Sequence, residues 1–366
     1  MRNKVIQLDA PNIGEREKEF LIRAVESGYV STAGPLVAEF EAAFAGLLGT
    51  KKAASTQSGT AALHMALYEL GIGKGDEVIV PATTFAATVN PVLYVGATPV
   101  IADVDVETWT LSPESVESNL TGRTKAVIPV HLYGVPCRMD EIMGIAEKHG
   151  LKVVEDATES LCSRYKGEFT GTFGDMGCFS FNGNKTITTG GGGMVVSREE
   201  QCIEHIKFLI NQARDESAGY YHPEVGFNYR MTNLEAALGL AQMGRLEEFV
   251  AKKRRFNKIY REELSGCGFI RFQQGPAFSE SSWWLTCILF EKDTDIPELQ
   301  LRLKSEGVPA RRVFMPLGEM PPYASFVRNP CGNAALLYER GLCLPSSTLN
   351  SDDDIRHVCK ILRELI

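Results

Sequence analysis

The stretch EVIVPATTFAATVNPVLYVGATPVIADV (77–104) decides the fold class of this chain of 366 residues. It holds two continuous apolar runs, EVIV (77–80) and TPVIADV (98–104). Continuous apolar runs are typical of strands that are buried on both faces, as in a parallel sheet covered by helices. Four similar runs follow, namely AVIPV (126–130), LKVVED (151–156), CFSFN (178–182) and GGMVVS (192–197). We therefore predict an α/β layer structure over about residues 50–240.

Apolar residues at helical spacing predict amphipathic helices around these strands. The predicted helices cover residues 14–27, 35–48, 59–70, 139–149 and 296–306. A long helix is predicted over 231–263, with the basic run 252–255 on a solvated face. Beyond about residue 265 the composition changes, and short strands around 283–290 indicate a smaller α+β unit. The predicted domains are a large one over residues 1–245 and a small one over residues 246–366.

The composition excludes several classes of protein. With 38 basic and 46 acidic residues the net charge is −8, which argues against a general nucleic-acid binder. Hydrophobic residues make up 44%, enough to exclude disorder for most of the chain. The N-terminus lacks the apolar core of a secretory signal, and no apolar run is long enough to cross a membrane. The nine scattered cysteines form no CxxC pair, which indicates reduced thiols and a cytoplasmic protein.

Ser58, Gly59 and Thr60 form the first candidate for a ligand site. They stand where the helix over 59–70 begins, and the N-terminus of a helix binds anions. The two hydroxyls could add hydrogen bonds to phosphate oxygens, and glycine lets the backbone approach a ligand closely. The alternative is an ordinary helix-capping turn.

Asp156 ends the predicted strand 151–156. In open parallel sheets, ligands bind outside the carboxyl ends of the strands. A carboxylate there could meet a ring nitrogen, or it could be a helix cap or half of a salt bridge. No second acidic or histidine ligand lies at convincing spacing, so we predict no metal site.

Lys185 lies in FSFNGNKTITTGGGGMVV (179–196), shortly before four glycines. A lysine in a tight, partly buried turn can act as a nucleophile through its amine, and Gly190 to Gly193 would let the chain turn around a planar ligand. The alternative is a surface lysine in a flexible hairpin. The glycine run has neither the spacing of a dinucleotide fingerprint nor that of a Walker motif.

Together these three features fit pyridoxal 5′-phosphate. The helix start would bind its phosphate, Lys185 would bond to it covalently, and Asp156 would keep its pyridine nitrogen protonated, which makes the ring an electron sink. An aromatic face is usually needed against the ring. Phe85, just after strand 77–80, is the candidate, and the alternative for it is a core aromatic.

Seven motifs resemble the DegT/DnrJ/EryC1/StrS family of nucleotide-sugar aminotransferases. They are SGTAALHMAL (58–67), GDEVIVPATTFAAT (75–88), GATPVIADVD (96–105), TKAVIPVHLYG (124–134), VVEDATES (153–160), GTFGDMGCFSFNGNKTITTGGGGMVV (171–196) and GFNYRMTNLEAALGLAQ (226–242). The resemblance implies the aspartate aminotransferase fold of type I. That fold has a large domain with a mostly parallel seven-stranded sheet and a smaller C-terminal α+β domain.

The resemblance also implies residue roles. Lys185 matches the lysine that carries the cofactor and acts as general acid and base, and Asp156 matches the partner of the pyridine nitrogen. Phe85 matches the stacking aromatic. The residues that contact the cofactor phosphate in the family are matched here by Ser58, Gly59, Thr60 and Ser180. Asn228 matches an asparagine that reaches the phosphate in the neighbouring subunit, which implies a homodimer with shared active sites.

The chain departs from many family members at two places. Glu159 replaces a glutamine near the ring hydroxyl of the cofactor, so its role as a cofactor-binding residue depends on its protonation or on hydrogen bonds that it accepts. Gly190 to Gly193 replaces Gly-Glu-Gly-Gly, which leaves the turn intact. One family branch replaces the lysine with histidine and is a sugar dehydratase, and Lys185 argues against that branch.

The implied reaction is a transamination in which L-glutamate donates its amino group, with pyridoxamine 5′-phosphate as the intermediate form. The expected acceptor is C4 of a 4-keto-6-deoxy nucleotide sugar, on a route to a surface polysaccharide or glycan. The first candidate is UDP-2-acetamido-4-keto-2,4,6-trideoxyhexose. The alternatives are GDP-4-keto-6-deoxymannose, a C3-keto sugar, a PLP enzyme of another outcome, and a regulator without catalysis. Substrate contacts are expected from the loop near Arg311 to Tyr323 and from the partner subunit. No nucleic-acid or membrane partner is expected.

Overall fold

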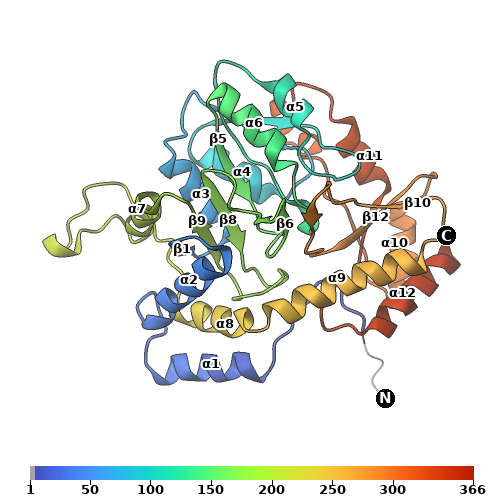
Figure 1. Cartoon of the computed structure of the whole chain (residues 1–366), viewed down its shortest axis with the longest axis horizontal. Coiled ribbons are helices and arrows are strands. Elements are labelled where there is room, and N and C mark those ends of the chain that lie inside the picture. Colours follow the sequence, from blue (N-terminus) through green and yellow to red (C-terminus); the bar gives the residue numbers. More distant parts are fainter. Residues whose placement is uncertain (1–4) are drawn as a thin grey trace.

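The computed structural model describes residues 5–366 and centres on a seven-stranded sheet (Figure 1). Its strands, in spatial order, are β1 (Ala53–Thr56), β9 (Gly193–Val196), β8 (Met176–Ser180), β5 (Lys152–Asp156), β4 (Thr124–Val127), β2 (Glu77–Pro81) and β3 (Thr98–Ala102). Neighbouring strands from β8 to β3 pair in parallel, whereas β9 runs antiparallel to both β1 and β8. The predicted α/β class with a mostly parallel seven-stranded sheet is confirmed.

Helices cover both faces of this sheet, which explains the continuous apolar runs. One face packs on α3 (Gly59–Glu69), α4 (Ala86–Tyr94) and α7 (Glu200–Ile210). The other face packs on α2 (Pro35–Leu48), α5 (Pro113–Asn119), α6 (Met139–His149) and α8 (Asn233–Met243). Within β2, Val78 and Val80 join the first core and Ile79 joins the second, so every position of the strand is buried.

The predicted single helix over 231–263 is wrong, because two helices occupy this stretch. Helix α8 ends at Met243, and α9 (Leu246–Glu263) begins after Gly244 and Arg245. The backbone leaves helical angles at Arg245 (φ −119°, ψ 1°), where the guanidinium reaches back to the carbonyl of Asn12 at 3.4 Å. Glycine inside a helix costs about 1 kcal/mol relative to alanine, which favours a break at Gly244.

The prediction that the basic run 252–255 lies on a solvated face is also wrong for most of its residues. Lys253 is buried and its Nζ donates to the carbonyls of Trp284 (3.0 Å) and Ser346 (2.9 Å). Arg254 donates to the carbonyl of Ser281. Only Arg255 of this run is exposed, where it pairs with an aspartate. Helix α9 is therefore bonded to the C-terminal segments along its length.

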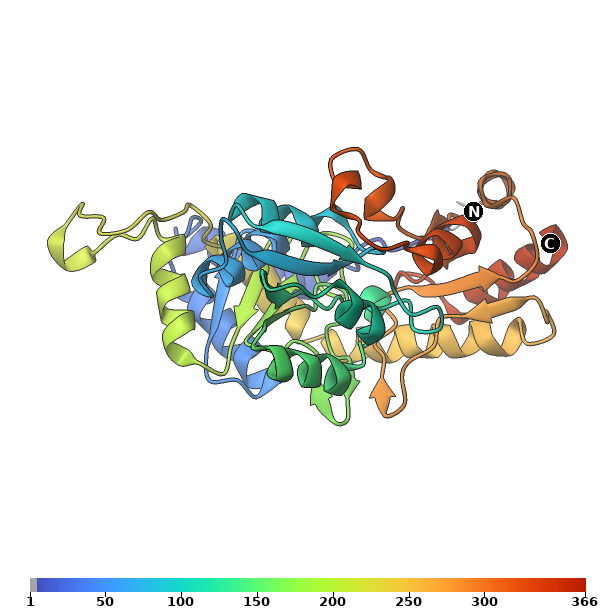
Figure 2. The same ribbon diagram turned by 90° about the horizontal axis from the view of Figure 1, so that it is seen from above.

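The C-terminal part forms a four-stranded antiparallel sheet on α9. Its strands, in spatial order, are β10 (Ile270–Phe272), β12 (Thr286–Phe290), β14 (Gly341–Leu344) and β13 (Arg311–Arg312). Helices α10 (Ile296–Ser305) and α12 (Asp352–Leu365) pack with α9 around it. A small sheet of β11 (Ser279–Glu280), β6 (Arg164–Tyr165) and β7 (Glu168–Phe169) joins this part to the central region, as Figure 2 shows from above.

The C-terminal part shares a core with the large sheet. Leu317, Tyr323 and Leu337 belong to the same buried cluster as Val78 and Val80. Residues 1–4 of the predicted first domain lie outside the described residues. The division at residues 245 and 246 stays a prediction, and it coincides with the break between α8 and α9. No helix within residues 5–366 has the length and apolar character that a bilayer span requires.

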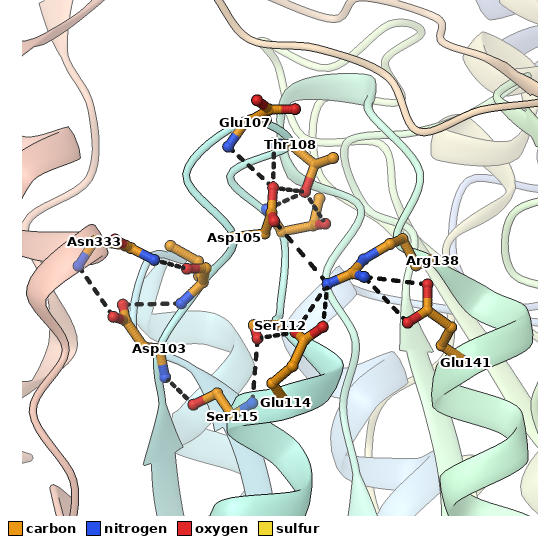
Figure 3. A network of polar contacts seen from close by, with 12 residues as sticks. Asp103, Asp105, Glu107, Thr108, Ser112, Glu114, Ser115, Arg138, Glu141 and Asn333 are labelled. Atoms are coloured by element: carbon orange, nitrogen blue, oxygen red, sulfur yellow. Dashed lines mark hydrogen bonds and ion pairs between the residues drawn. The ribbon is translucent and has the colours of Figure 1, made fainter.

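A polar network fixes α11 (Gly332–Arg340) to the end of β3 (Figure 3). The carboxylate of Asp103 accepts hydrogen bonds from the backbone N–H groups of Asn333 and Ala334, both at 3.0 Å. Its own backbone N–H donates to Ser115 Oγ at 2.7 Å. Asp103 thus satisfies free donors at the start of α11 and connects two distant parts of the chain.

Candidate active site

A cavity of about 220 Å³ lies where the carboxyl ends of the central strands meet the C-terminal part. Eight of the nine predicted site residues line it, namely Ser58, Gly59, Thr60, Phe85, Asp156, Glu159, Ser180 and Lys185. The ninth, Asn228, does not. The cavity therefore joins residues from four separate motifs of the sequence.

The start of α3 forms one end of the cavity. Ser58 caps the helix, since its Oγ accepts from the backbone N–H of Ala61 at 3.1 Å. The first N–H groups of a helix have no carbonyl partner within it, and they carry partial positive charge. Gly59 packs so closely that a Cβ there would lie 2.9 Å from Cβ of Ser180. This end of the cavity is therefore suited to an anion such as a phosphate.

Asp156 lies at the carboxyl end of β5 and is 3% exposed. Its Oδ2 accepts from Thr88 Oγ1 at 2.7 Å, and its Oδ1 accepts from Thr158 Oγ1 at 2.7 Å. Within residues 5–366 no cationic side chain pairs with it. A buried carboxylate without a counter-cation is costly, so a protonated nitrogen of a ligand would fit this position.

Lys185 and Glu159 form an ion pair on the wall of the cavity. Lys185 Nζ lies 3.3 Å from Glu159 Oε1, and Glu159 Oε2 accepts from the backbone N–H of Tyr133 at 2.9 Å. Both carboxylate oxygens thus accept hydrogen bonds. Lys185 Nζ also lies 4.3 Å from the centre of the Trp284 ring, where a cation is attracted to the π face.

The turn that carries Lys185 is held from two sides. The Trp284 indole Nε1 donates to the carbonyl of Asn184 at 2.7 Å. Asn184 Nδ2 donates to Asp9 Oδ2 at 2.9 Å. With its side chain 14% exposed, Lys185 is neither a surface lysine nor part of a free hairpin.

Phe85 lies on the wall of the cavity rather than in the core. It precedes α4, it is 59% exposed, and its ring contacts that of Phe314 at 5.9 Å between centroids. An exposed aromatic ring beside a cavity leaves a face available for a planar ligand.

Several lining residues escaped the sequence analysis. They are Thr84, Thr88, Thr158, Asn182, Asn184 and Trp284. Arg311 and Phe314 also line the cavity, and both belong to the loop near residues 311–323 from which substrate contacts are expected. The three threonines lie close to Phe85 or Asp156 in the sequence, so their positions in these motifs could have indicated that they line the site. Trp284 comes from the C-terminal part, and no local pattern places it near Lys185.

Asn228 is exposed and lies apart from the cavity, where it pairs with Asn211 in an isolated bridge. It follows a segment between α7 and α8 that projects from the body of the molecule (Figures 1 and 2). That segment exposes large apolar side chains, with Tyr220 at 89% and Val225 at 74%. Within one subunit Asn228 thus contributes nothing to the cavity.

These features fit pyridoxal 5′-phosphate. The cavity combines an anion-binding helix start, a buried carboxylate without a cation and a lysine amine. Each matches one chemical group of that cofactor, namely its phosphate, its ring nitrogen and its aldehyde. The donor set of the site therefore agrees with the cofactor that the sequence implied.

The model of the DegT/DnrJ/EryC1/StrS aminotransferase family matches residues 11–363. GDP-perosamine synthase of Escherichia coli O157:H7 is 38% identical over 362 residues, which cover 99% of this chain and 98% of that protein. GDP-perosamine synthase of Caulobacter vibrioides is 39% identical, with the same two coverages. UDP-N-acetyl-3-dehydro-alpha-D-glucosamine 3-aminotransferase of Acidithiobacillus ferrooxidans is 36% identical over 89% of this chain and 87% of its own length.

Two solved structures share the whole fold. Spr1654 from Streptococcus pneumoniae in its PMP form matches with a TM-score of 0.95 and 26% identity, over 99% of this chain and 98% of that chain. The same protein is also known in a PLP form. DesI in the presence of its TDP-sugar product matches with a TM-score of 0.91 and 33% identity, over 99% of this chain and 93% of that chain.

Proposed function

The chain belongs to the DegT/DnrJ/EryC1/StrS family of PLP-dependent sugar aminotransferases, and we propose that it transfers the amino group of L-glutamate to C4 of a 4-keto-6-deoxy nucleotide sugar. One observation carries the proposal. Lys185 Nζ lies 3.3 Å from Glu159 in the cavity that also holds Asp156 and the start of α3. A transaminase needs an amine base, a carboxylate for the ring nitrogen and an anion site in one place.

When bound, the cofactor supplies an electron sink that makes the Cα–H bond of an amino acid acidic. Lys185 would hold the cofactor and would carry the proton on Nζ during amino transfer. Asp156 would keep a proton on the ring nitrogen, and Phe85 would stack on the ring. Ser58, Gly59, Thr60 and Ser180 would bind the phosphate, and Glu159 would accept a hydrogen bond from the ring hydroxyl.

A homodimer would complete this site. Asn228 is absent from the cavity of its own subunit, yet it directly follows a projecting segment with exposed apolar side chains. Large exposed apolar side chains that lie together are typical of protein interfaces. The segment would pack on a second copy of the chain, where Asn228 would reach the phosphate end of the partner's cavity.

Three nucleotide sugars are candidates for the acceptor. The sequence motifs favour UDP-2-acetamido-4-keto-2,4,6-trideoxyhexose. The two GDP-perosamine synthases, each similar over nearly the whole chain, favour GDP-4-keto-6-deoxymannose as the second candidate. The 3-aminotransferase of Acidithiobacillus supports a C3-keto sugar as a third candidate.

The absorbance spectrum of the purified protein tests the proposal, first with L-glutamate and then with the keto sugars. L-Glutamate alone should bleach the yellow band of the PLP form. The bleached enzyme is then mixed with each keto-sugar nucleotide, and the one that restores the colour is the acceptor. A yellow protein that glutamate leaves unchanged would contradict the proposed donor. Recovery with a C3-keto sugar alone would contradict amination at C4.

A further inference from the structure

Two thiols lie side by side next to the wall of the cavity. Cys287 on β12 and Cys343 on β14 are partners in the antiparallel register, so their side chains lie on the same face of the C-terminal sheet. Both are buried, and both belong to the core cluster that contains Trp284. The Sγ atom of Cys287 donates to that of Cys343 at 3.4 Å. The proposed function uses neither thiol.

The position of the two cysteines in the sheet suits a disulfide. A disulfide usually joins residues whose Cα atoms are about 4.4–6.8 Å apart, and residues directly opposite in an antiparallel pair are about 4.5–5.5 Å apart. The register of Cys287 and Cys343 meets this requirement without any change in strand pairing. The sulfur atoms would have to approach from 3.4 Å to about 2.0 Å, which small changes in the side-chain torsions can supply.

A cation stands on the other side of Cys343. Arg311 on β13 is the second register partner of Cys343, so Cys287, Cys343 and Arg311 form one row across three strands. Arg311 Nη1 pairs with Asp9, but its Nε and Nη2 are buried and have no hydrogen-bond partner within residues 5–366. A guanidinium with free N–H donors stabilises negative charge beside it.

These neighbours favour the thiolate of Cys343. Burial alone would raise the pKa of Cys343, but the hydrogen bond from Cys287 and the positive charge of Arg311 lower that pKa below its usual value. Burial and the contact with Cys343 raise the pKa of Cys287. Peroxides react with thiolates rather than with thiols. Cys343 is therefore suited to be the attacking sulfur, with Cys287 beside it as the second thiol.

The cavity offers a path to this pair. Arg311 lines the cavity with a side chain that is 34% exposed, whereas both cysteines are buried. A molecule as small as hydrogen peroxide could pass along the guanidinium to Cys343. Glutathione disulfide, a molecule of peptide size, is too large for this path.

We propose that Cys343 and Cys287 are a modification site, at which a hydroperoxide converts the two thiols into a disulfide. First the Cys343 thiolate attacks the peroxide, the O–O bond breaks, and Cys343 becomes a sulfenic acid while the leaving oxygen takes up a proton. Then Cys287 attacks the sulfenic sulfur, the S–S bond forms, and water leaves with the proton of Cys287.

The electrons balance in this sequence. The two sulfur atoms together lose two electrons, and these reduce the hydroperoxide to an alcohol, or hydrogen peroxide to water. This chemistry needs neither the cofactor nor an amino donor, so it is independent of the proposed function.

Peptide mapping of the PLP-loaded protein tests the proposal. The reduced protein is treated with one equivalent of hydrogen peroxide, and the remaining thiols are alkylated under denaturing conditions before digestion and mass spectrometry. The wild type should lose two of its nine free thiols. The peptides that contain Cys287 and Cys343 should be joined by a bond that dithiothreitol cleaves. Glutathione disulfide in place of peroxide should leave both thiols free.

Two alanine variants separate this pair from the other thiols. Cys287→Ala should form no disulfide and should carry the sulfenic acid on Cys343, which dimedone labels on unfolding. Cys359→Ala is the matched control, because Cys359 is equally buried but lies on α12 in a separate core cluster. It should form the disulfide like the wild type. Thermal melting checks the fold of each variant, and Cys287→Ser replaces Cys287→Ala if the latter does not fold.

Three results would overturn the proposal. The first is that Cys287 and Cys343 stay free or pair with other cysteines while peroxide is consumed. The second is that glutathione disulfide oxidises the pair as readily as hydrogen peroxide does. The third is a dimedone label on other cysteines of Cys287→Ala but not on Cys343. If L-glutamate does not bleach the wild type, the proposed function fails, whereas the peptide map still decides the fate of the two thiols.

Discussion

Gly59 is a residue of the cavity wall at which one added methyl group would clash. A Cβ there would lie 2.9 Å from Cβ of Ser180 and 3.2 Å from Cγ2 of Thr158, so Gly59→Ala must push β8 away from the start of α3. We expect the apparent Kd for PLP to rise by about tenfold or more, since the phosphate contacts come from both elements. Spectral titration of the apoprotein with PLP measures it.

Gly46→Ala is the control for this prediction. Gly46 lies within α2 and is exposed, and its new Cβ would meet no atom within 4 Å outside its own helix backbone and chain neighbours. Alanine there should raise the free energy of unfolding by about 0.5–1 kcal/mol and leave PLP affinity unchanged. Equal PLP affinity in Gly59→Ala and wild type would show that the close approach has no part in phosphate binding.

Single site residues could be predicted from the sequence where a local motif also indicates ligand binding. Lys185, Asp156 and Ser58 to Thr60 each stand at a strand end or a helix start, where local pattern and ligand binding coincide. Trp284 could not be predicted, because the strand that follows it, β12, is placed by pairing with β14 and not by any spacing relative to Lys185. The loop near Arg311 could be predicted only as a source of substrate contacts, without a role for any one residue. Lys253 was misjudged because a basic run is usually solvated, whereas here two backbone carbonyls bind its ammonium.

At the scale of elements, Asp103 shows how a distant residue can cap a helix. Its two oxygens accept from the first N–H groups of α11, so Asp103→Ala leaves those donors without partners. We expect a loss of about 1–2 kcal/mol in the free energy of unfolding, measured by urea denaturation.

Arg138→Ala tests the other half of the network in Figure 3. Arg138 pairs with Glu114 and Glu141, whose side chains are 70% and 45% exposed. Surface pairs contribute little, so this change should alter the free energy of unfolding by less than about 1 kcal/mol. A loss for Arg138→Ala as large as that for Asp103→Ala would mean that the network, and not the cap, holds α11.

The order of strands and helices along the chain was easier to predict than the positions at which single helices end. The strand Lys152–Asp156, buried at every position after Lys152, was clear from its sequence. By contrast β1, with the sequence AAST, has too few large apolar residues to be recognised. Gly244 is the local signal for the break between α8 and α9, whereas Arg245 at the break contacts Asn12, which is 233 positions away in the chain. Contacts of that separation leave no periodic trace in the sequence.

At the scale of the whole molecule, Glu77 joins the central sheet to the C-terminal part. Its buried carboxylate accepts hydrogen bonds from Arg328 (2.5 Å), Thr121 (2.7 Å) and Arg123 (2.5 Å). The hydrogen bond from Arg328, aided by the other two and opposed by burial, lowers the pKa of Glu77 to about 2. Arg328 comes from the segment that pairs with β3 at Val327, so the carboxylate ties that segment to the sheet.

The pH dependence of stability follows from this lowered pKa. Because the folded pKa lies below the unfolded value of 4.5, the stabilisation is complete above pH 4.5 and is lost as the pH falls toward 2. It amounts to at most about 3 kcal/mol. Glu77→Gln should remove it and flatten the acid limb of a denaturation profile. The pKa of Glu114 is also lowered, chiefly by a hydrogen bond from Ser112, but its side chain is 70% exposed, so Glu114→Gln should flatten that limb much less than Glu77→Gln does.

The proposed dimer predicts complementation between two defective variants. Lys185→Ala should lower turnover by at least about 100-fold through loss of the acid–base group. Asn228→Ala should bind PLP weakly, because its phosphate contact is missing. In a mixed dimer the intact Lys185 and the intact Asn228 meet in one site, since they come from different subunits.

Equal mixing should give about half mixed dimers with one complete site each, and so about a quarter of wild-type activity at limiting PLP. Steady-state turnover after unfolding and refolding the two variants together measures it, with each variant refolded alone as the control. If Asn228 served its own subunit, the mixed dimer would contain two damaged sites. The mixture would then never exceed the mean of the two parents, and the exposed position of Asn228 would need another partner.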